Sequence, residues 1–225
     1  MSLTIGIYDF FAYTLPGVFY LFIIIYLYKI AGVMRVDFQI LNNLSILSVI
    51  AITAVAYILG LIIDPVAKRW YRLFRKKNAS EVVLDRLKEN NPHLEIKFQA
   101  QDWPILRAYI RREDNSLVSE IERMNVMRIM LRNISLCLAI FAVIQISQYV
   151  IYNFFPLNLV LGVAFVLASI IAGRESAKFA DWFHEGFYEA IIAYSLELSD
   201  LVVKGEKAIH ENNDEAEKHY KKRPD

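Results

Sequence analysis

The chain has 225 residues, of which 56% are hydrophobic and 22% charged, and its formal net charge at pH 7 is +1. This hydrophobic share exceeds the about 45–50% that is usual for soluble domains. A nearly neutral chain also lacks the basic footprint of a nucleic-acid-binding domain. The single cysteine, Cys137, excludes an intramolecular disulfide.

Four apolar stretches dominate the sequence. Each comes close to the about 20 residues that an α-helix needs to cross a hydrocarbon core about 30 Å thick. The sequence therefore predicts an all-α, polytopic membrane protein with four transmembrane helices. The stretches cover residues 15–34, 44–63, 134–152 and 154–172.

The N-terminal residues 3–13 are apolar and aromatic and lead into Leu15-Pro16-Gly17. Proline fits best in the first turn of a helix, and the residue before it favours an extended backbone. We therefore expect a short interfacial segment, a break, and a first membrane helix from about Pro16. Because no Lys or Arg precedes this helix, as one would in a signal peptide, a retained anchor is expected. A mobile plug or gate beside a pore is the alternative for residues 3–13.

The second apolar stretch has one small and polar helical face. Membrane helices that pack closely favour small residues and bundle-facing hydroxyls, so Gly60 is expected to pack against a neighbour. Asp64 is a functional candidate because ionisable residues at membrane depth usually have a role. Lys68 lies one turn away, however, which favours an ion pair over a proton or ion site. Three- and four-residue steps place on this face Thr53, Ala56, Tyr57, Gly60 and Asp64.

The segment between the two helix pairs is expected to be helical and cytoplasmic. Asn78 followed by Glu81 resembles a capping box, which predicts a helix to about residue 89. Asp102-Trp103-Pro104 is typical of a second helix start.

A single long helix is predicted from Ser116 to about Asn153, because no helix breaker interrupts this part of the sequence. It would have about 37 residues and a length near 55 Å. Since this exceeds the bilayer thickness, its first half is expected to project into the cytoplasm.

The third apolar stretch carries Gln145 and Gln148 on the same helical face as Cys137 and Phe141. Amide side chains inside a bilayer need hydrogen-bond partners. Two interpretations stay open: this face lines a polar pore, or it hydrogen-bonds to a neighbouring helix or subunit.

The fourth apolar stretch has Ala164, Ala168 and Ala172 at four-residue spacing, which predicts a seam where helices approach closely. The helical pattern then continues as an amphipathic cytoplasmic helix. Its apolar face is expected to pack on the central segment or on another copy of the chain. From about Gly205 the tail is charged and poor in apolar residues, so a frayed or disordered end is expected.

The orientation follows from the cationic residues, which flank the apolar stretches mainly on one side. Lys and Arg close to membrane ends set topology, so both termini and the central segment are expected in the cytoplasm, beneath a bacterial inner membrane. Contact with anionic lipid and stacking on single-stranded nucleic acid are the alternative roles of the largest basic run. This run contains Lys68, Arg69, Arg72, Arg75, Lys76 and Lys77.

These patterns divide the chain into four predicted segments. The interfacial segment and transmembrane helices 1 and 2 occupy residues 1–66, and the cytoplasmic helical segment occupies residues 67–132. Transmembrane helices 3 and 4 occupy residues 133–174, and the cytoplasmic amphipathic helix and charged tail occupy residues 175–225.

No complete catalytic or metal-binding signature occurs. The four histidines form no His-Glu-x-x-His motif, and no cysteine pair exists for a thiolate zinc site. Arg132-Asn133 begins like the Arg-x-x-x-x-His signature of HEPN-type nucleases, but Cys137 stands in the histidine's place. Neither an enzymatic activity nor a cofactor is expected.

The chain opens with Ile7-Tyr8-Asp9-Phe10-Phe11-Ala12-Tyr13-Thr14-Leu15-Pro16-Gly17 and continues with paired membrane helices around a cytoplasmic middle. This layout resembles the small bacterial four-helix membrane proteins found beside CRISPR or other antiphage genes. The resemblance implies an effector or accessory that disturbs the membrane after an infection signal. It implies no particular site residue.

The favoured hypothesis is a homo-oligomeric inner-membrane protein whose cytoplasmic helices receive a partner or signal and whose bundle responds by perturbing the membrane or forming a pore. The alternative is a non-conducting scaffold that anchors a cytoplasmic partner enzyme. A lipid-acting membrane enzyme is the least favoured. The expected partners are the lipid bilayer, further copies of the chain and a cytoplasmic protein; nucleic acid is not expected.

Overall fold

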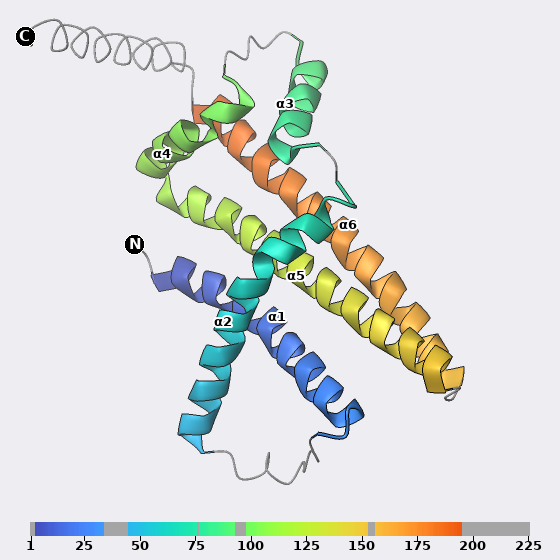
Figure 1. The fold of residues 1–225 in the computed structure, drawn as a ribbon. Helices are drawn as coiled ribbons and strands as arrows, with labels where there is room; N and C mark the ends of the chain where they lie inside the picture. Colours follow the sequence, from blue (N-terminus) through green and yellow to red (C-terminus); the bar gives the residue numbers. More distant parts are fainter. Residues whose placement is uncertain (1–2, 34–44, 76, 93–97, 153–155, 195–225) are drawn as a thin grey trace, which may run out of the picture. The chain divides into compact units, whose positions relative to one another are not determined.

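The computed structural model describes residues 3–33, 45–75, 77–92, 98–152 and 156–194. Over these residues the fold is all-α (Figure 1). The helices are α1 (Leu3–Ile30), α2 (Ile46–Tyr71), α3 (Ala79–Asn90), η2 (Ala100–Asp102, a 3-10 turn), α4 (Trp103–Glu113), α5 (Asn115–Tyr152) and α6 (Pro156–Tyr194).

Four of these helices, α1, α2, α5 and α6, are long and apolar enough to cross a membrane. The prediction of an all-α chain with four apolar helices of spanning length is therefore confirmed. The predicted long helix from Ser116 is also confirmed, because α5 contains 38 residues without interruption. Lys76 and the charged tail beyond Gly205 lie outside the described residues.

The chain divides into two compact units. The first, which we call the apolar bundle, consists of Met1–Ala79 and Ser119–His184. The second, which we call the small helical unit, consists of Ser80–Val118 and Glu185–Asp225. The predicted segment boundaries at residues 66, 132 and 174 fall inside α2, α5 and α6, because these helices do not end where their apolar composition ends.

The predicted break before Pro16 is wrong. Helix α1 runs from Leu3 to Ile30 with Pro16 inside it, and it bends between its two halves (Figure 1). A proline removes one backbone hydrogen bond, but a membrane bundle tolerates it where neighbouring helices and Ser or Thr hydroxyls compensate. Pro16 is fully buried, and the hydroxyl of Thr14 donates to the Phe10 carbonyl at 2.7 Å.

The second helix also extends beyond its predicted end at Ile63. Helix α2 continues through Pro65 to Tyr71, so that Lys68 begins its last turn and does not lie in a loop. Asp64 and Ala67 are both buried in this extension. Burial of this face against α5 compensates for the hydrogen bond that Pro65 does not make.

Helices α1 and α2 touch through their backbones. A Cβ atom at Gly17 would lie 1.8 Å from the carbonyl oxygen of Ala56, and a Cβ atom at Gly60 would lie 2.1 Å from that of Tyr13. Two glycines on opposite helices therefore set the crossing. Beside this contact the ring of Tyr57 stacks on Phe10, with the ring centroids 5.4 Å apart.

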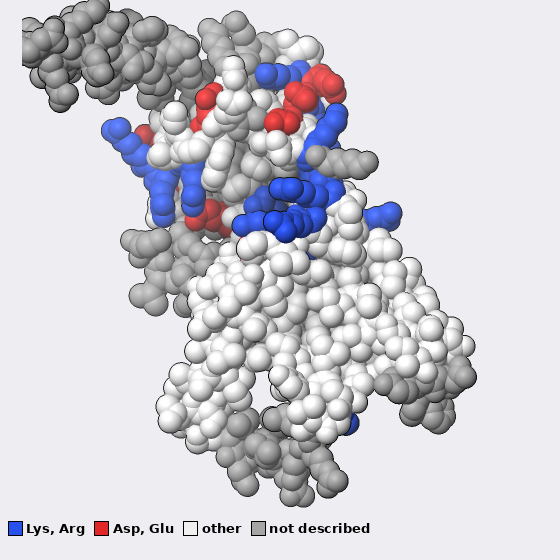
Figure 2. All heavy atoms as spheres, in the orientation of Figure 1, with Lys and Arg blue, Asp and Glu red and all other residues white. Residues whose placement is uncertain are grey.

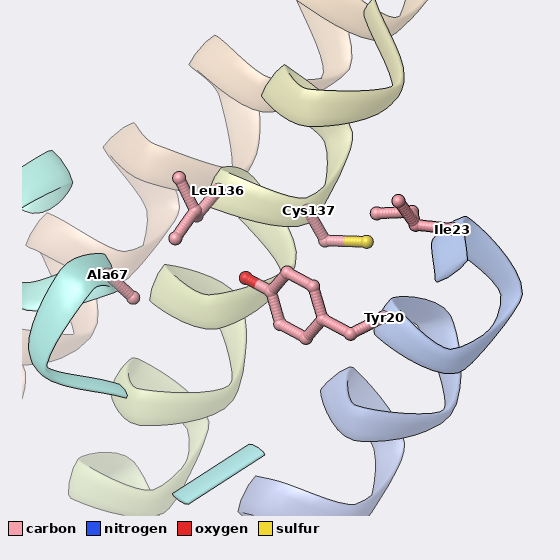
Figure 3. Packing of buried hydrophobic residues seen from close by; sticks show 5 residues of the cluster. All are labelled: Tyr20, Ile23, Ala67, Leu136 and Cys137. Atoms are coloured by element: carbon pink, nitrogen blue, oxygen red, sulfur yellow. The ribbon is translucent and has the colours of Figure 1, made fainter. Parts of the chain in front are cut away.

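An apolar core joins α1, α2 and α5 (Figure 3). Tyr20 reaches from α1 toward α5, and the Cys137 sulfur points from α5 toward Ile23 of α1. Partly buried aromatic and aliphatic side chains of α2 and α5 pack around this core. The buried members are Tyr20, Ile23, Ala67, Leu136 and Cys137.

The surface of the apolar bundle is that of a multi-pass membrane protein. Large apolar side chains are exposed on all four long helices, including Ile46 at 82% and Leu47 at 77%. Figure 2 shows Lys and Arg atoms gathered along one border of a broad surface that carries almost no charge. Exposed apolar area of this extent would drive aggregation in water, whereas lipid covers it in a bilayer.

The small helical unit has an apolar core of its own. The ring centroids of Phe98 and Tyr188 are 5.4 Å apart, and those of Trp103 and Phe187 are 6.2 Å apart. The predicted helix starts near Asn78 and at Trp103 are confirmed by α3 and α4. Asp114 caps α5 by accepting hydrogen bonds from the Ser116 and Leu117 amides at 2.9 and 3.0 Å. Hydrogen bonds from Ser116, first of all from its hydroxyl, and from Leu117 lower the pKa of Asp114.

We expect the Gly60→Ala variant to unfold more readily than the wild type, because an added methyl group would force α1 and α2 apart. Overpacking of this kind costs about 1–3 kcal/mol. The free energy of unfolding in mixed detergent micelles measures the change. Ala54→Val on the exposed face of α2 is the control and should leave the unfolding free energy unchanged; equal effects of the two variants would contradict the close contact.

Candidate functional site: a buried ionic junction

The most polar buried site of the apolar bundle lies where the apolar stretches end. Asp64 of α2 is 5% exposed, and Arg132 and Asn133 of α5 are 5% and 0% exposed. The Arg132 guanidinium donates to the Asp64 carboxylate at 2.5 Å, and the Asn133 amide donates to the same oxygen at 3.2 Å. Lys68 reaches the other carboxylate oxygen at 3.0 Å. We call these four residues the ionic junction.

The ionic junction meets part of the conditions under which a buried ion pair is tolerated, although Arg132 Nε and Asn133 Oδ1 are buried without a hydrogen-bond partner. Desolvation of a carboxylate and a guanidinium is costly unless good geometry and further hydrogen bonds compensate. Asn133 supplies such a bond, and its second amide hydrogen is held by the Ile129 carbonyl at 3.1 Å. Lys68 is 59% exposed, so its contribution is screened by solvent or headgroups.

The neighbouring turn of α5 contacts the three other helices of the apolar bundle. The Tyr20 hydroxyl of α1 donates to the Asn133 carbonyl at 2.9 Å. The Trp70 indole of α2 donates to the Ser135 hydroxyl at 3.0 Å. Ser135 and Ser169 of α6 donate to each other's backbone carbonyls at 2.8 and 2.7 Å. Residues 132–135 of α5 are therefore the polar centre of the bundle.

The two glutamines predicted for a polar face bind α1. The Gln145 amide donates to the Tyr26 hydroxyl at 3.1 Å, and this hydroxyl donates to the Gln148 carbonyl oxygen at 3.2 Å. We call these three residues the glutamine cluster. In the described chain their polar groups hydrogen-bond between helices, which is the second of the two interpretations offered by the sequence.

The remaining predicted polar residues are not brought together with the glutamines. Thr53 donates back to the Val49 carbonyl of its own helix at 2.8 Å. Tyr57 contacts Phe10 and Tyr13 of α1 through its ring. No hydrogen bond links either of them to Gln145 or Gln148 in the part of the chain that the structure describes.

The predicted packing residues occupy different environments. Gly60 lies in the α1–α2 contact, and Ala172 is buried, but Ala168 is half-buried and Ala164 is exposed. Up to Phe183, the buried residues of α6 are Gly162, Ser169, Ala172, Gly173, Ser176, Ala180 and Phe183. Part of this set is polar, since Ser176 donates to the Arg128 carbonyl of α5 at 2.9 Å.

The basic run has two kinds of member. Lys68 belongs to the ionic junction, while Arg69, Arg72 and Lys77 are exposed. Arg75 is largely buried: it forms an ion pair with Asp181 of α6 and donates to the Ala177 carbonyl at 3.1 Å. Arg75 therefore ties the end of α2 to α6, a role that its position in a basic run does not reveal.

The residues that sequence reasoning missed are Arg132 and Asn133 as partners of Asp64, and Ser135 and Ser169 as a pair. In the sequence, Arg132 and Asn133 stand out only as the start of an incomplete nuclease motif. The available signal was the position of Arg132 and Asn133, because these two polar residues precede the third apolar stretch directly. Asp64 follows the second apolar stretch directly, so all three are expected at the same membrane depth. The residues of the second and third apolar stretches do not show which helices face each other.

An apolar cavity of about 320 Å³ lies beside this centre and holds the Cys137 side chain in its wall. Among the described residues, no three His, Cys, Asp or Glu side chains gather into a group that could hold a metal ion. The cavity is lined by Phe19, Phe22, Ile134, Cys137, Leu138, Phe141 and Phe165.

No protein-family model, curated protein or solved structure matches this chain.

We expect Asp64→Asn to lower the free energy of unfolding by about 3–5 kcal/mol, because it leaves the buried Arg132 without its carboxylate. Replacing both partners, as in Asp64→Leu with Arg132→Met, should cost much less, since no buried charge remains. Unfolding in mixed micelles is the measurement, analysed as a double-mutant cycle.

Lys68→Met is the matched control for this cycle and should cost at most about 1 kcal/mol, because the lysine is largely exposed. An Asp64→Asn variant no less stable than Lys68→Met would show that Arg132 is not held by Asp64.

Proposed function

We propose that this chain is a homo-oligomeric, multi-pass protein of a bacterial inner membrane that couples a cytoplasmic signal or partner to perturbation of the membrane. One observation carries the proposal: α5 and α6 supply residues both to the apolar bundle and to the small helical unit. A partner that binds the small helical unit acts on helices whose other ends are lipid-exposed. The antiphage role follows from the resemblance in layout alone.

Charge asymmetry supports an orientation with both termini and the small helical unit in the cytoplasm. The basic residues that follow the second apolar stretch, and those that precede the third, flank the same end of the apolar bundle. The opposite end has Lys29 as its cation among the described residues. The bias is the one expected for a cytoplasmic central segment.

The orientation is tested by cysteine labelling, because native Cys137 is buried and gives little background. Val33→Cys, at the end of α1, should react with a membrane-impermeant maleimide in intact spheroplasts. Arg112→Cys, at the end of α4, should react only after permeabilisation. Labelling in the reverse order would place the central segment outside the cell and contradict the proposal.

The glutamine cluster is the element that we assign to the response of the membrane. Polar groups at this depth are costly without partners, so the resting bundle holds them on Tyr26. Rearrangement of α5 relative to α1 releases both amides, which then need water or a second copy of the chain. A polar path or a defect in the bilayer is the consequence.

We expect Tyr26→Phe to increase dye release from liposomes that contain the full-length protein. This variant removes both hydrogen bonds of the glutamine cluster and keeps the aromatic ring. Two such bonds are worth about 1–2 kcal/mol together, which corresponds to roughly a tenfold shift toward the released state. Tyr28→Phe, at an exposed position on the same helix, is the matched control and should leave the leak unchanged.

A non-conducting scaffold is the second candidate, and the glutamine cluster is also the observation that favours it, because these polar groups are satisfied within one chain. On this hypothesis the small helical unit binds one soluble partner in a fixed ratio. Gln145→Leu with Gln148→Leu would then leave partner binding intact. Absence of leak in the wild type, in Tyr26→Phe and in a partner-bound complex would decide for the scaffold.

A further inference from the structure

A second polar cluster lies beside the ionic junction, between the end of α2 and the facing surfaces of α5 and α6. Its members come from three helices or their ends, and all belong to the apolar bundle. Arg75 and Asp181 form its ion pair. We call it the Arg128 cluster, and it contains Tyr71, Arg75, Arg128, Asp181, Phe183 and His184.

Arg128 has no anionic partner in this cluster. Its guanidinium lies over the ring of Phe183, 5.7 Å from the ring centroid. It forms no ion pair with a carboxylate of the described residues, and its Nε atom is buried without a hydrogen-bond acceptor. The Arg128 side chain is half-buried, and partial desolvation of a guanidinium without an anion is unfavourable. The aromatic ring of Phe183 compensates for only part of this cost.

The remaining groups also favour an anion. The Tyr71 hydroxyl is buried and has no acceptor for its proton; Arg75, which lies close enough to interact with it, can only donate. His184 is within electrostatic reach of the same two arginines. Arg75, in contrast, is already occupied by Asp181 and the Ala177 carbonyl.

The local charge is positive even when every ion pair is counted. The ionic junction and the Arg128 cluster together contain four cations and two carboxylates. The cations are Lys68, Arg75, Arg128 and Arg132, and the carboxylates are Asp64 and Asp181. Two positive charges remain. An anion with several acceptor oxygens can take the guanidinium fork and the phenol donor together.

The depth of the Arg128 cluster in the membrane indicates that the anion comes from a lipid headgroup. Arg128 lies six residues before the apolar stretch that begins at Ile134, which is about 9 Å along a helix. The headgroup layer on each side of a bilayer is roughly 5–8 Å thick. A helix that spans the membrane with a moderate tilt therefore places Arg128 at the outer edge of the headgroup layer, next to the lipid phosphates.

We propose that the Arg128 cluster binds the phosphate group of an anionic phospholipid, with the Arg128 guanidinium as its charge partner and the Tyr71 hydroxyl as a hydrogen-bond donor. The lipid then bridges α2 and α5 at the same end of the bundle as the ionic junction. This site does not depend on the proposed coupling function, because it requires only that the four long helices span a bilayer.

The test uses the full-length protein in a neutral detergent, with phosphatidylglycerol, phosphatidylcholine or inorganic phosphate added at equal concentration. Thermal unfolding and native mass spectrometry measure stabilisation and the number of bound lipids. Phosphatidylglycerol should stabilise the wild type most, because the phosphatidylcholine headgroup brings a cation toward a positive site. Equal stabilisation by the two lipids would overturn the proposal. Inorganic phosphate that reproduces the full effect would assign the site to a soluble phosphate and overturn the lipid assignment.

Two variants separate the site from general lipid contact. Arg128→Gln should weaken phosphatidylglycerol binding at least about tenfold, and Tyr71→Phe about threefold or more, since hydrogen bonds to charged groups are the stronger class. Without lipid, Arg128→Gln should melt no lower than the wild type, because it removes a half-buried charge that has no anion. Tyr71→Phe keeps the ring and deletes only a hydroxyl that has no acceptor for its proton, so it tests the site even if Arg128→Gln folds poorly.

Arg174→Gln is the matched control, because Arg174 is an exposed cation on α6. It should leave binding within about twofold of the wild type, as expected for a solvated surface charge. Loss of binding in Arg174→Gln equal to that in Arg128→Gln would reduce the effect to general surface charge and overturn the assigned site.

Discussion

A carboxylate at the edge of a membrane bundle has to be hydrated or paired, and Asp64 is paired. Arg132 and Asn133 hold one of its oxygens and Lys68 the other. Because Asp64 and Arg132 lie on different helices and are both about 5% exposed, the pair sets the register of α2 against α5. A shift of one residue along either helix would separate the charges inside a poorly polarisable surrounding, which is far more costly than the loss of an apolar contact.

The bonds next to this pair extend the constraint to α1 and α6. Tyr20 reaches the backbone at Asn133, and Ser135 exchanges hydrogen bonds with Ser169. One turn before Asp64 on the same face of α2, Gly60 meets α1, where Gly17 also allows backbone contact between the two helices. Polar bonds set the axial positions, and small residues set the distances. Lipid offers no hydrophobic driving force between helices, so packing and interhelical hydrogen bonds of this kind are what hold a bundle together.

The Arg128 cluster and the glutamine cluster differ in how well their polar groups are satisfied. Gln145, Gln148 and Tyr26 complete one another's hydrogen bonds within the chain. Arg128 and Tyr71 leave buried donors without acceptors. In our two proposals the glutamine cluster is a resting arrangement that can be opened, and the Arg128 cluster, whose free cation has no carboxylate partner, is the place where an anion binds. The two proposals for response and for lipid binding rest on this difference.

Much of the helical content could be predicted, because helix boundaries and spans depend on local sequence. The capping residues before α3 and α4 and the absence of breakers after Ser116 identified the helices of the central segment. The two errors, at Pro16 and beyond Ile63, share a cause. Proline disfavours a helix interior in isolation, but burial against neighbouring helices outweighs that preference, and burial is not a local property.

The same limit explains the candidate site. Composition and spacing identified Asp64, Lys68, Gln145 and Gln148 as polar residues in apolar surroundings, since that is readable along one helix. The partners Arg132, Ser169 and Tyr26 lie 34 to 122 residues away from the residues they bind, from the Ser135–Ser169 pair to the Tyr26–Gln148 bond. Apolar length and charge bias by themselves determined a four-span, all-α chain. Only the tertiary structure decided which polar groups meet. Their meeting depends on how the packed helices are rotated and aligned along their axes, and no local residue pattern determines that rotation or alignment.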